Sequence, residues 1–499
     1  MQVGEKARES IKNGINIVAN AVKETFGVGG RTVVIPAFMG GYGITKDGVS
    51  VAKAVILDDE YENIIASIVK DASIKTNNEV GDGTTTSAIL TQAIYNEVLK
   101  QQISGRNLNS LLKGVESATK DVLDALKTSS IEVDDKMLKN VASISANNDE
   151  DLGEIISDVY KKVGKDGVVT IEGSESSETY VEMIKGMSFD GNLISRLFSQ
   201  NSNMENVYVA TVNYKIERVD EISSLLEQIV TKDKRPILFI VDDMSFDVQD
   251  ALHQNQNYIK SCVIKANVYG DKRNKFYEDI SKYVGCKLFS IEDGTLISSA
   301  SFEDLGKCDR IKIDGSKAVV VGGKGENIEE YISLVEQQGG SDVKERIASL
   351  KESVGVIKLG ASTKTEFDEK IDRVEDAINA TKSALLEGVI PGGGIALLKI
   401  ATNFLKEGSF STDEEIGKKA LYEAIMTPSK LILSNSGLSE HLIDNVKEDK
   451  FNIGWDVASN SKKDFVKVGI IDPVKVTRVA LENASSVART LLSSNVIIK

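Results

Sequence analysis

The hydrophobic rhythm of the chain changes twice, and this change constrains the fold more than any other feature of the sequence. Near the N-terminus apolar residues recur at the spacing of an amphipathic helix, and the same spacing returns after about residue 366. Between about 186 and 354, short apolar runs such as 207–212 and 237–241 alternate with helical segments. Alternating strands and helices are typical of a sheet-centred domain. We therefore predict a multidomain α and α/β protein in which an α/β domain is inserted into a helical one.

One loop of the helical part has an unusual composition. The segment Gly81-Asp82-Gly83-Thr84-Thr85-Thr86 places a single acid between two glycines and ends in three hydroxyls, and helical spacing follows it. A tight loop that leads into a helix N-terminus offers free backbone N–H groups to an anion such as phosphate. Glycines let the backbone approach the anion, and a carboxylate oxygen suits Mg²⁺. The same residues also fit a turn with threonine capping, so this loop alone leaves both interpretations open.

Other loops and acids extend this pattern. Polar or glycine-rich loops also end regular elements at 25–30 and 45–48, so three loops are available to meet at one ligand. Asp376 lies off the apolar face of a predicted helix, where a solvated carboxylate is the simplest interpretation. Asp472 precedes a proline, which predicts a helix N-cap. The glycine cluster at 322–325 lacks the order of a Walker phosphate loop, and we expect a hairpin turn there.

Composition excludes several classes of function. The 499 residues carry a net charge of −15, which argues against a nucleic-acid binder, and they contain no apolar run long enough for a membrane span. The first ten residues resemble neither a signal peptide nor a transit peptide, so we expect a cytoplasmic protein. With only 3 dispersed cysteines and 2 histidines, a zinc site or a histidine-based triad is not expected. Chemistry must depend on carboxylates, hydroxyls, lysines and the backbone.

Motifs at both ends of the chain resemble, in order and spacing, those of the GroEL-type (group I) chaperonins. The resemblance covers essentially the whole chain, apart from shortening in the middle and at the C-terminus. The motifs that carry it are Thr25-Phe26-Gly27, Ile44 to Ser50, Gly81 to Thr86, Ser145-Ala146-Asn147, Ser301 to Gly306, Arg373 to Ala377, Gly392-Gly393-Gly394 and Ile471 to Arg478.

The resemblance implies the chaperonin fold, with three domains in discontinuous order. A helical equatorial domain would bind ATP over 1–128 and 387–499, and a small intermediate domain would span 129–185 and 355–386. An α/β apical domain over 186–354 would bind non-native polypeptides. The resemblance further implies ATP and Mg²⁺ as cofactors, ATPase activity, a homo-oligomeric ring of seven subunits, single or double, and a lid-like co-chaperonin as partner. The expected location is the cytoplasm of a bacterium or of an infected host cell.

The resemblance also implies roles for single residues. Asp82 is similar to the Mg²⁺ ligand, and Asp47 and Asp376 are similar to the two catalytic acids that orient the attacking water. Phosphoryl transfer needs positioning and charge neutralisation more than a covalent nucleophile, so such a set requires no histidine. The implied nucleotide-binding set is Thr25, Phe26, Gly27, Val28, Lys46, Asp82, Gly83, Thr84, Thr85, Thr86, Gly393, Asp456, Val457, Ala458 and Asp472, the last of these at the ribose hydroxyls. The implied polypeptide-binding set is Leu193, Leu197, Phe198, Leu226 and Leu252.

The sequence departs from the family pattern at several of these places. Val28 replaces a proline, and Asp456 replaces an asparagine at the expected adenine site, which adds a charge. Polar or small residues replace aliphatic ones on the expected apical face, at Ser223, Asp247 and Ala251, while Phe246 and Val248 either compensate or belong to the core. Gly191 and Lys364 replace an inter-subunit arginine–glutamate pair, Glu387 and Arg478 keep another pair, and Glu352-Ser353 and Ile131 alter the two hinges.

Two functions of different class follow. The first is an ATP-hydrolysing chaperonin that assists the folding of non-native polypeptides. The second, favoured by the weakened apical apolar face, is a nucleotide-binding ring that holds unfolded proteins without productive folding. A metabolic enzyme with a phosphate site is a weaker third reading, supported only by the α/β segment and the glycine loops.

Overall fold

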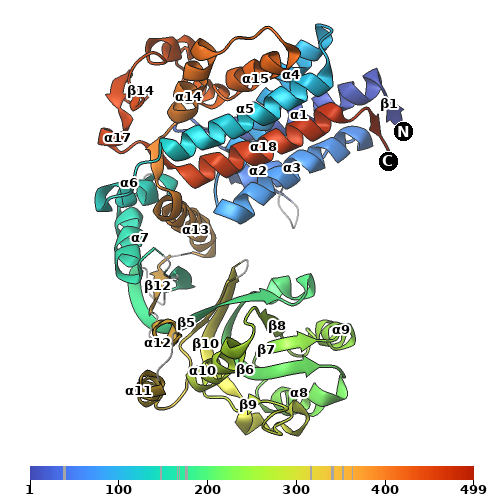
Figure 1. Ribbon diagram of the computed structural model, residues 1–499, viewed down its shortest axis with the longest axis vertical. Helices are drawn as coiled ribbons and strands as arrows, with labels where there is room; N and C mark the ends of the chain where they lie inside the picture. The colour runs from blue at the N-terminus through green and yellow to red at the C-terminus, as the bar shows by residue number, and fades with distance from the viewer. Residues whose placement is uncertain are drawn as a thin grey trace. The chain divides into compact units, whose positions relative to one another are not determined.

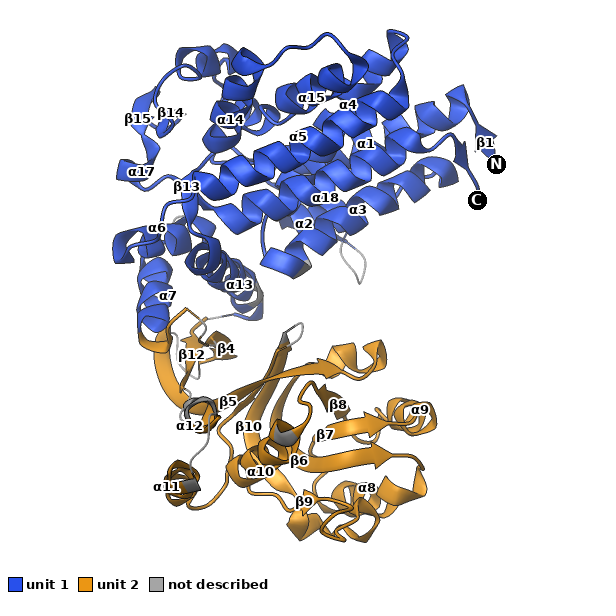
Figure 2. Ribbon diagram, in the orientation of Figure 1, with its two compact units in different colours: residues 1–161, 363–499 blue, residues 162–362 orange. Residues whose placement is uncertain are grey.

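The computed structural model divides the chain into two compact units, which are described separately (Figure 2). Unit 1 comprises residues 1–161 and 363–499, and unit 2 comprises residues 162–362. The structure describes all residues except 37–40, 147–148, 166, 168, 175–177, 315–316, 339–341, 351–352 and 362. Asn147 and Glu352, which belong to motifs of the family resemblance, therefore lie outside the described residues.

Unit 1 is a helical domain with small two-stranded sheets. Its helices are α1 (Glu5–Lys23), α2 (Gly48–Ala54), α3 (Glu60–Val80), α4 (Thr84–Ile103), α5 (Leu108–Thr128), α6 (Asp135–Ser145), α7 (Glu150–Val163), α13 (Lys364–Glu387), α14 (Ile395–Glu407), α15 (Asp413–Ala424), α16 (Thr427–Asn435), the short α17 (Phe465–Val468) and α18 (Val474–Ser493). Its antiparallel strand pairs are β1 (Gln2–Val3) with β17 (Val496–Ile497), β2 (Val33–Pro36) with β3 (Tyr42–Thr45), β13 (Val389–Pro391) with β16 (Ile471–Pro473), and β14 (Ile453–Asp456) with β15 (Ser461–Asp464).

The long helices of unit 1 pack around one apolar core (Figure 1). In α1 the predicted apolar stripe is confirmed, since Ile11, Ile15 and Val18 are fully buried. Gly14 on the same helix brings α1 against α3, because a β-carbon there would lie 2.7 Å from the carbonyl oxygen of Glu62. Burial of each such aliphatic side chain contributes about 1.5–3 kcal/mol, so the helices are held by packing more than by their intrinsic propensity.

Unit 2 is built on a single mixed sheet, as the α/β rhythm predicts. Its described strands follow the order β11-β10-β6-β7-β8-β5-β12-β4, with β9 beside β6. The strands are β4 (Val169–Gly173), β5 (Tyr180–Leu193), β6 (Asn203–Ile216), β7 (Ile237–Met244), β8 (Ser261–Ala266), β9 (Leu288–Phe289), β10 (Gly306–Asp314), β11 (Lys317–Val321) and β12 (Ser353–Leu359). The helices are α8 (Asp220–Lys232), α9 (Phe246–Gln254), α10 (Asp271–Val284), α11 (Ile328–Gln338) and α12 (Val343–Leu350).

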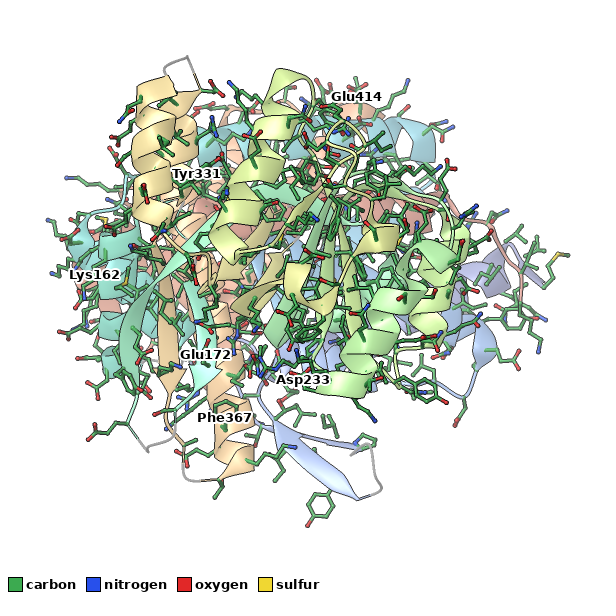
Figure 3. All side chains as sticks on the ribbon, turned by 90° about the horizontal axis from the view of Figure 1, so that it is seen from below. Lys162, Glu172, Asp233, Tyr331, Phe367 and Glu414 are labelled. Atoms are coloured by element: carbon green, nitrogen blue, oxygen red, sulfur yellow. The ribbon has the colours of Figure 1, made fainter. Side chains whose placement is uncertain are left out.

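The centre of this sheet is parallel. Strand β7 pairs in parallel with β6 and β8, and α8 and α9 form the crossovers between these strands. Parallel strands covered by helices read as continuous apolar runs, and the run Ile237–Val241 is fully buried. Helices α10, α11 and α12 are joined by a buried ion pair. Arg346 donates to Asp279 at 2.7 and 2.9 Å, and the hydroxyl of Tyr331 (labelled in Figure 3) donates to the same carboxylate at 2.8 Å.

The structure differs from the sequence expectations at the segment 322–325 and in the expected intermediate domain. The expected hairpin turn at 322–325 is wrong, because β11 ends at Val321 and the chain continues through this segment into α11. The expected intermediate domain does not form a unit of its own by contacts, since α6, most of α7 and all of α13 belong to unit 1 while β4 and β12 belong to the sheet of unit 2. The three-domain boundaries remain a prediction.

Candidate functional site

The loop between α3 and α4 has the geometry of an anion site. Gly81 ends α3 and Gly83 precedes α4, and both adopt the left-handed conformation, with φ of 69° and 81°. Among the described residues, no side chain caps the first turn of α4 and no acid lies in it. The N–H groups of Thr84, Thr85 and Thr86 therefore point outward from a 20-residue helix without acceptors from the described part of the chain.

Asp82 lies between these two glycines. Its Oδ1 accepts the N–H of Gly83 at 2.5 Å, which fixes the carboxylate at the entrance to α4. Burial raises the pKa of Asp82, and the neighbouring charge of Asp47 raises it further. A cation close to Asp82 would therefore stabilise the ionised form of its carboxylate.

The loop at 45–48 packs directly onto this helix start. Asp47 is the N-cap of α2, and its carboxylate accepts the N–H of Val49 at 3.0 Å and of Ser50 at 2.7 Å. Gly48 follows, and a β-carbon there would lie 1.9 Å from Oγ1 of Thr85 and 3.6 Å from Oγ1 of Thr25. Only glycine permits this approach, which brings residues of all three sequence loops together.

These loops line one cavity of about 570 Å³ in unit 1. Twelve of the sequence-predicted residues lie in its wall: Thr25, Phe26, Gly27, Val28, Lys46, Asp82, Gly83, Thr86, Gly393, Asp456, Val457 and Asp472. The other predicted residues, Thr84, Thr85, Ala458 and the two catalytic acids, are not among the residues of the wall. The cavity has the size typical of a small-molecule site.

Asp376 does not line the cavity, but it lies close enough to Asp82, which does, for the two charges to interact. It projects from α13, is half-buried, and has a pKa raised to about 8, first by burial and then by the charges of Asp82 and Asp47. The expectation of a fully solvated carboxylate is therefore wrong. Asp47 is exposed, and its role as a helix cap leaves further lone pairs on both oxygens.

Asp472, from the C-terminal part of the chain, lies close enough to Asp82 for their charges to interact. Its pKa is raised to about 6 by burial and by Asp82, while the N–H of Gly393 donates to its carboxylate and opposes this shift. The predicted capping role is wrong: Pro473 is the N-cap of α18, and the side chain of Asp472 does not cap the helix. In its place, the contact with Gly393 fixes β16 to the glycine segment that follows β13.

The charge that Asp456 adds to the expected adenine site is neutralised locally. Its carboxylate pairs with Lys463 at 2.7 Å and accepts the N–H of Ala458 at 3.1 Å and the hydroxyl of Ser459 at 2.5 Å. These partners outweigh the effect of burial and lower the pKa of Asp456. Asp456 therefore holds the turn between β14 and β15 in shape beside the cavity.

The far end of the cavity is apolar, and the sequence did not predict it. Its wall includes Ile395, Leu433, Ile443, Val446 and Phe465, which are buried members of one hydrophobic cluster. Trp455, the single tryptophan of the chain, packs against this cluster and also lines the cavity. The only sequence signal for this apolar wall was the position of Trp455 next to Asp456. The other wall residues come from separate segments of the chain.

The carboxylates of the polar end suit one hard cation. Among the described residues, Asp47, Asp82, Asp376 and Asp472 form no ion pair with lysine or arginine. The charge of Asp47 raises the pKa of Asp82 and Asp376, and the charge of Asp82 raises that of Asp376 and Asp472. No three histidine, cysteine or acidic side chains in the described part converge tightly enough to hold a metal by themselves. Mg²⁺ prefers one or two carboxylates together with water and phosphate oxygens, so the donor set fits an ion that arrives with a phosphate ligand.

The predicted polypeptide-binding residues differ in accessibility. In unit 2, Leu193, Leu197 and Leu226 are half-buried, whereas Phe198 and Leu252 are buried in the sheet core with at most 2% exposure. Core positions cannot contact a client, so the assignment of Phe198 and Leu252 is corrected to a structural role. Val248 is also fully buried, whereas Phe246, at the start of α9, is 69% exposed.

Of the two family ion pairs considered in the sequence, the one between Glu387 and Arg478 is present. Arg478 on α18 donates to both oxygens of Glu387, at 2.6 and 2.9 Å. This bidentate pair fixes the end of α13 to α18 within unit 1. Gly191 and Lys364 cannot form the other pair, because glycine has no side chain.

Comparison with known proteins identifies similar chains. A family model described as the TCP-1/cpn60 chaperonin family matches residues 18–499. Two crystal structures of the chaperonin gp146 from bacteriophage EL 2 (Pseudomonas aeruginosa), both in the presence of ATP-BeFx, share this fold. In crystal form II the identity is 22%, the TM-score is 0.70, and 99% of this chain and 98% of that chain are covered. In crystal form I the identity is 21% and the TM-score is 0.63, with the same coverage. In the described part of the chain, none of the helices has both the length and the apolar character of a membrane span.

Proposed function

Because the chain belongs to the TCP-1/cpn60 chaperonin family, we propose that it is an ATP-dependent chaperonin that hydrolyses ATP and assists the folding of non-native polypeptides. One observation carries the ATPase part of this proposal. The free N-terminus of α4, with Asp82 at its entrance, forms one end of a cavity whose other end is apolar.

The two ends of the cavity match the two ends of a nucleotide. Phosphate groups would lie against the N–H groups of α4 and near Lys46, where the helix dipole and the ammonium favour negative charge. The base would lie against the apolar wall that contains Trp455 and Val457. Asp472 and Gly393 also line the cavity, and the ribose would lie against them, as the family resemblance implies.

Asp82 would hold Mg²⁺, which neutralises phosphate charge during transfer to water. Asp47 and Asp376 would orient and deprotonate that water, since Asp47 acts electrostatically on Asp82 and both Asp82 and Asp47 act on Asp376. With a raised pKa, Asp376 is a stronger base than an ordinary aspartate once it is ionised. A cation at Asp82 favours the ionised form of Asp376, so ligand binding would prepare the base.

Unit 2 would bind the non-native polypeptide, and copies of the chain would assemble into a ring. Exposed Phe246 and half-buried Leu226 supply apolar surface on α9 and α8 for this purpose. The polar replacements on these helices, Ser223 and Asp247, favour the alternative of a ring that holds clients without folding them. A ring of seven copies, a lid-like co-chaperonin and a cytoplasmic location belong to this proposal.

The variant Asp376→Asn tests the catalytic assignment. It keeps the shape of the side chain but removes the base, so we expect ATP binding within about threefold of wild type and turnover reduced by about 100-fold or more. Asp71→Asn, at an exposed acid of α3, is the matched control and should leave both unchanged. Turnover of Asp376→Asn close to that of wild type would exclude Asp376 as the base.

ATP-dependent recovery of a denatured client separates the two candidate functions. Suppressed aggregation with ATP-dependent return of client activity supports the folding chaperonin. Suppressed aggregation without any return of activity supports the holding ring.

A further inference from the structure

A second cavity of about 400 Å³ lies between α1 and α4, and it shares no lining residue with the candidate nucleotide cavity. Its wall combines three lysines and several amide and hydroxyl side chains with a few apolar ones. Helix α1 contributes Lys12, Asn16 and Lys23, and α4 contributes Gln92, Ala93, Asn96, Glu97, Leu99, Lys100 and Ile103, with Thr427 at the start of α16. The residues of each helix recur at spacings of three, four and seven, so the two lining faces are continuous stripes.

The three lysines have very little opposing charge. Glu97 is the single acid of this wall and already pairs with Lys100 at 2.6 Å. Within the described part of the chain, Lys12 and Lys23 have no acidic group at ion-pair distance. Such a basic cluster is uncommon on a chain with a net charge of −15, where carboxylates outnumber basic groups.

Lys23 is held in the wall despite a cost in solvation. Its side chain is half-buried, and burial lowers the pKa of its ammonium more than the more distant Glu440 raises it. A negative charge in the cavity would restore the pKa of Lys23 and remove this cost. Lys12 is exposed at the other end of the same stripe, so the two ammonium groups flank the cavity.

The amides between the lysines are oriented to donate. Gln92 is 5% exposed, and its Nε2 donates to Oδ1 of Asn16 at 2.7 Å and of Asn20 at 3.1 Å. Asn96 approaches the same oxygen of Asn16 at 3.5 Å. Because the oxygen of Asn16 is used as an acceptor, its amide N–H₂ group is left to donate to a ligand in the cavity.

We propose that this cavity binds a phosphate-class anion, held by Lys12, Lys23 and the amide of Asn16. The wall contains no aromatic side chain comparable to Trp455, which argues against a nucleotide. Lys12 and Lys23 lie about 16 Å apart along the axis of α1, so the expected ligand is a short oligophosphate. Ammonium and amide donors together form charge-assisted hydrogen bonds to phosphate oxygens. This site is independent of the proposed ATPase.

Calorimetric titration of the full-length protein with inorganic tripolyphosphate, in buffer without Mg²⁺, tests the proposal. We expect one site for each chain. The double variant Lys12→Gln/Lys23→Gln should bind at least about tenfold more weakly, because it removes two charge-assisted hydrogen bonds to the ligand. Lys12→Arg/Lys23→Arg should retain most of the affinity.

The control variant Lys113→Gln/Lys136→Gln removes the same charge from exposed lysines outside the cavity and should bind as wild type does. As a measurement that needs no variant, tripolyphosphate should protect Lys12 and Lys23, but not Lys113, from chemical acetylation. Equal weakening in both double variants would show diffuse electrostatics and overturn the proposal. Binding that is lost in Lys46→Gln but kept in Lys12→Gln/Lys23→Gln would place the anion in the nucleotide cavity and also overturn it.

An acidic segment of a second copy of the chain is the competing occupant. In that case Lys12→Gln/Lys23→Gln would change the mass measured by light scattering, while wild type would show no heat with tripolyphosphate. That pair of results would overturn the anion site.

Discussion

At the residue scale, the central feature is a group of four carboxylates that share a small region without lysine or arginine partners among the described residues. Asp82 and Asp47 disfavour ionisation of Asp376, and Asp82 does the same to Asp472. Structural acids of this protein behave differently: Glu387 pairs with Arg478, and the pKa of Glu387 is lowered. Perturbed acids in a cavity are typical of functional sites.

Asp47 combines a structural and a proposed catalytic role, and two substitutions separate them. Asparagine also caps helices well, so Asp47→Asn should unfold within about 0.5 kcal/mol of wild type. Asp47→Ala loses the bonds to Val49 and Ser50, and we expect a cost of about 1 kcal/mol. Both variants should lose most ATP turnover. Denaturant unfolding and an ATPase assay measure the two effects, and an active Asp47→Asn variant would contradict the catalytic role.

The raised pKa of Asp376 predicts a pH-dependent stability of the ligand-free protein. The folded state keeps this proton up to about pH 8, whereas an unfolded aspartate loses it near pH 4, so the folded state binds more protons across this window. Stability therefore falls as pH rises from 4 to 8. Asp82, Asp376 and Asp472 all contribute to this fall, and the part due to Asp376 extends to about pH 8.

From pH 6 to 8 the effect is at most about 1.4 kcal/mol for each pH unit, and solvent at the half-buried site reduces it. The wild-type melting temperature should therefore drop more over this range than that of Asp376→Asn. Parallel thermal-denaturation profiles for the two proteins would contradict this origin of the pH dependence.

At the scale of elements, α8 and α9 show how helix packing changes the interpretation of a motif. Both helices cover the parallel strands, and this packing takes Leu252 and Val248 into the core. Phe246 precedes the first buried turn of α9 and stays exposed. The exposed apolar surface of these helices is therefore smaller than the resemblance implies, and Phe246 supplies a large part of it.

Phe246→Ser tests this point. The side chain is 69% exposed, so the substitution should leave stability nearly unchanged while removing about 1–3 kcal/mol of apolar burial from a bound client. Aggregation of a denatured client, followed by light scattering, should be suppressed much less by this variant. Leu334→Ser, at an apolar residue of α11 that is 51% exposed, is the matched control and should behave as wild type. Equal suppression by Phe246→Ser and wild type would exclude α9 as a client surface.

At the scale of the whole molecule, the proposed nucleotide cavity is formed within unit 1 from segments at both ends of the chain. Residues 25–30 and 81–86 meet residues 393–394 and 455–457 around it. A nucleotide should therefore stabilise contacts between the two ends of the sequence, by about 2.7 kcal/mol at a concentration 100 times its Kd.

Hydrogen exchange with and without Mg²⁺–ATP checks this expectation. Amides in these four segments should exchange more slowly with nucleotide, because binding would close the local openings of the cavity wall. The buried strands β6, β7 and β8 of unit 2 should exchange at the same rate in both states. Protection limited to the first two segments would contradict the proposed position of the base.

Sequence patterns alone predicted the fold class, the inserted α/β segment and the tight glycine loop before α4. These features depend on residues close together in the chain: helical spacing, β-rich runs, and the backbone freedom of Gly81 and Gly83. The family resemblance adds the expected roles of the acids, which remain predictions.

The tertiary structure decided what depends on distant neighbours. It paired Asp456 with Lys463, set Asp472 against Gly393 instead of a helix end, and buried Phe198. It also assembled the apolar wall around Trp455 and the basic cavity between α1 and α4. The physical reason is that burial and electrostatic environment are set by packing between segments remote in sequence, to which local periodicity carries no information.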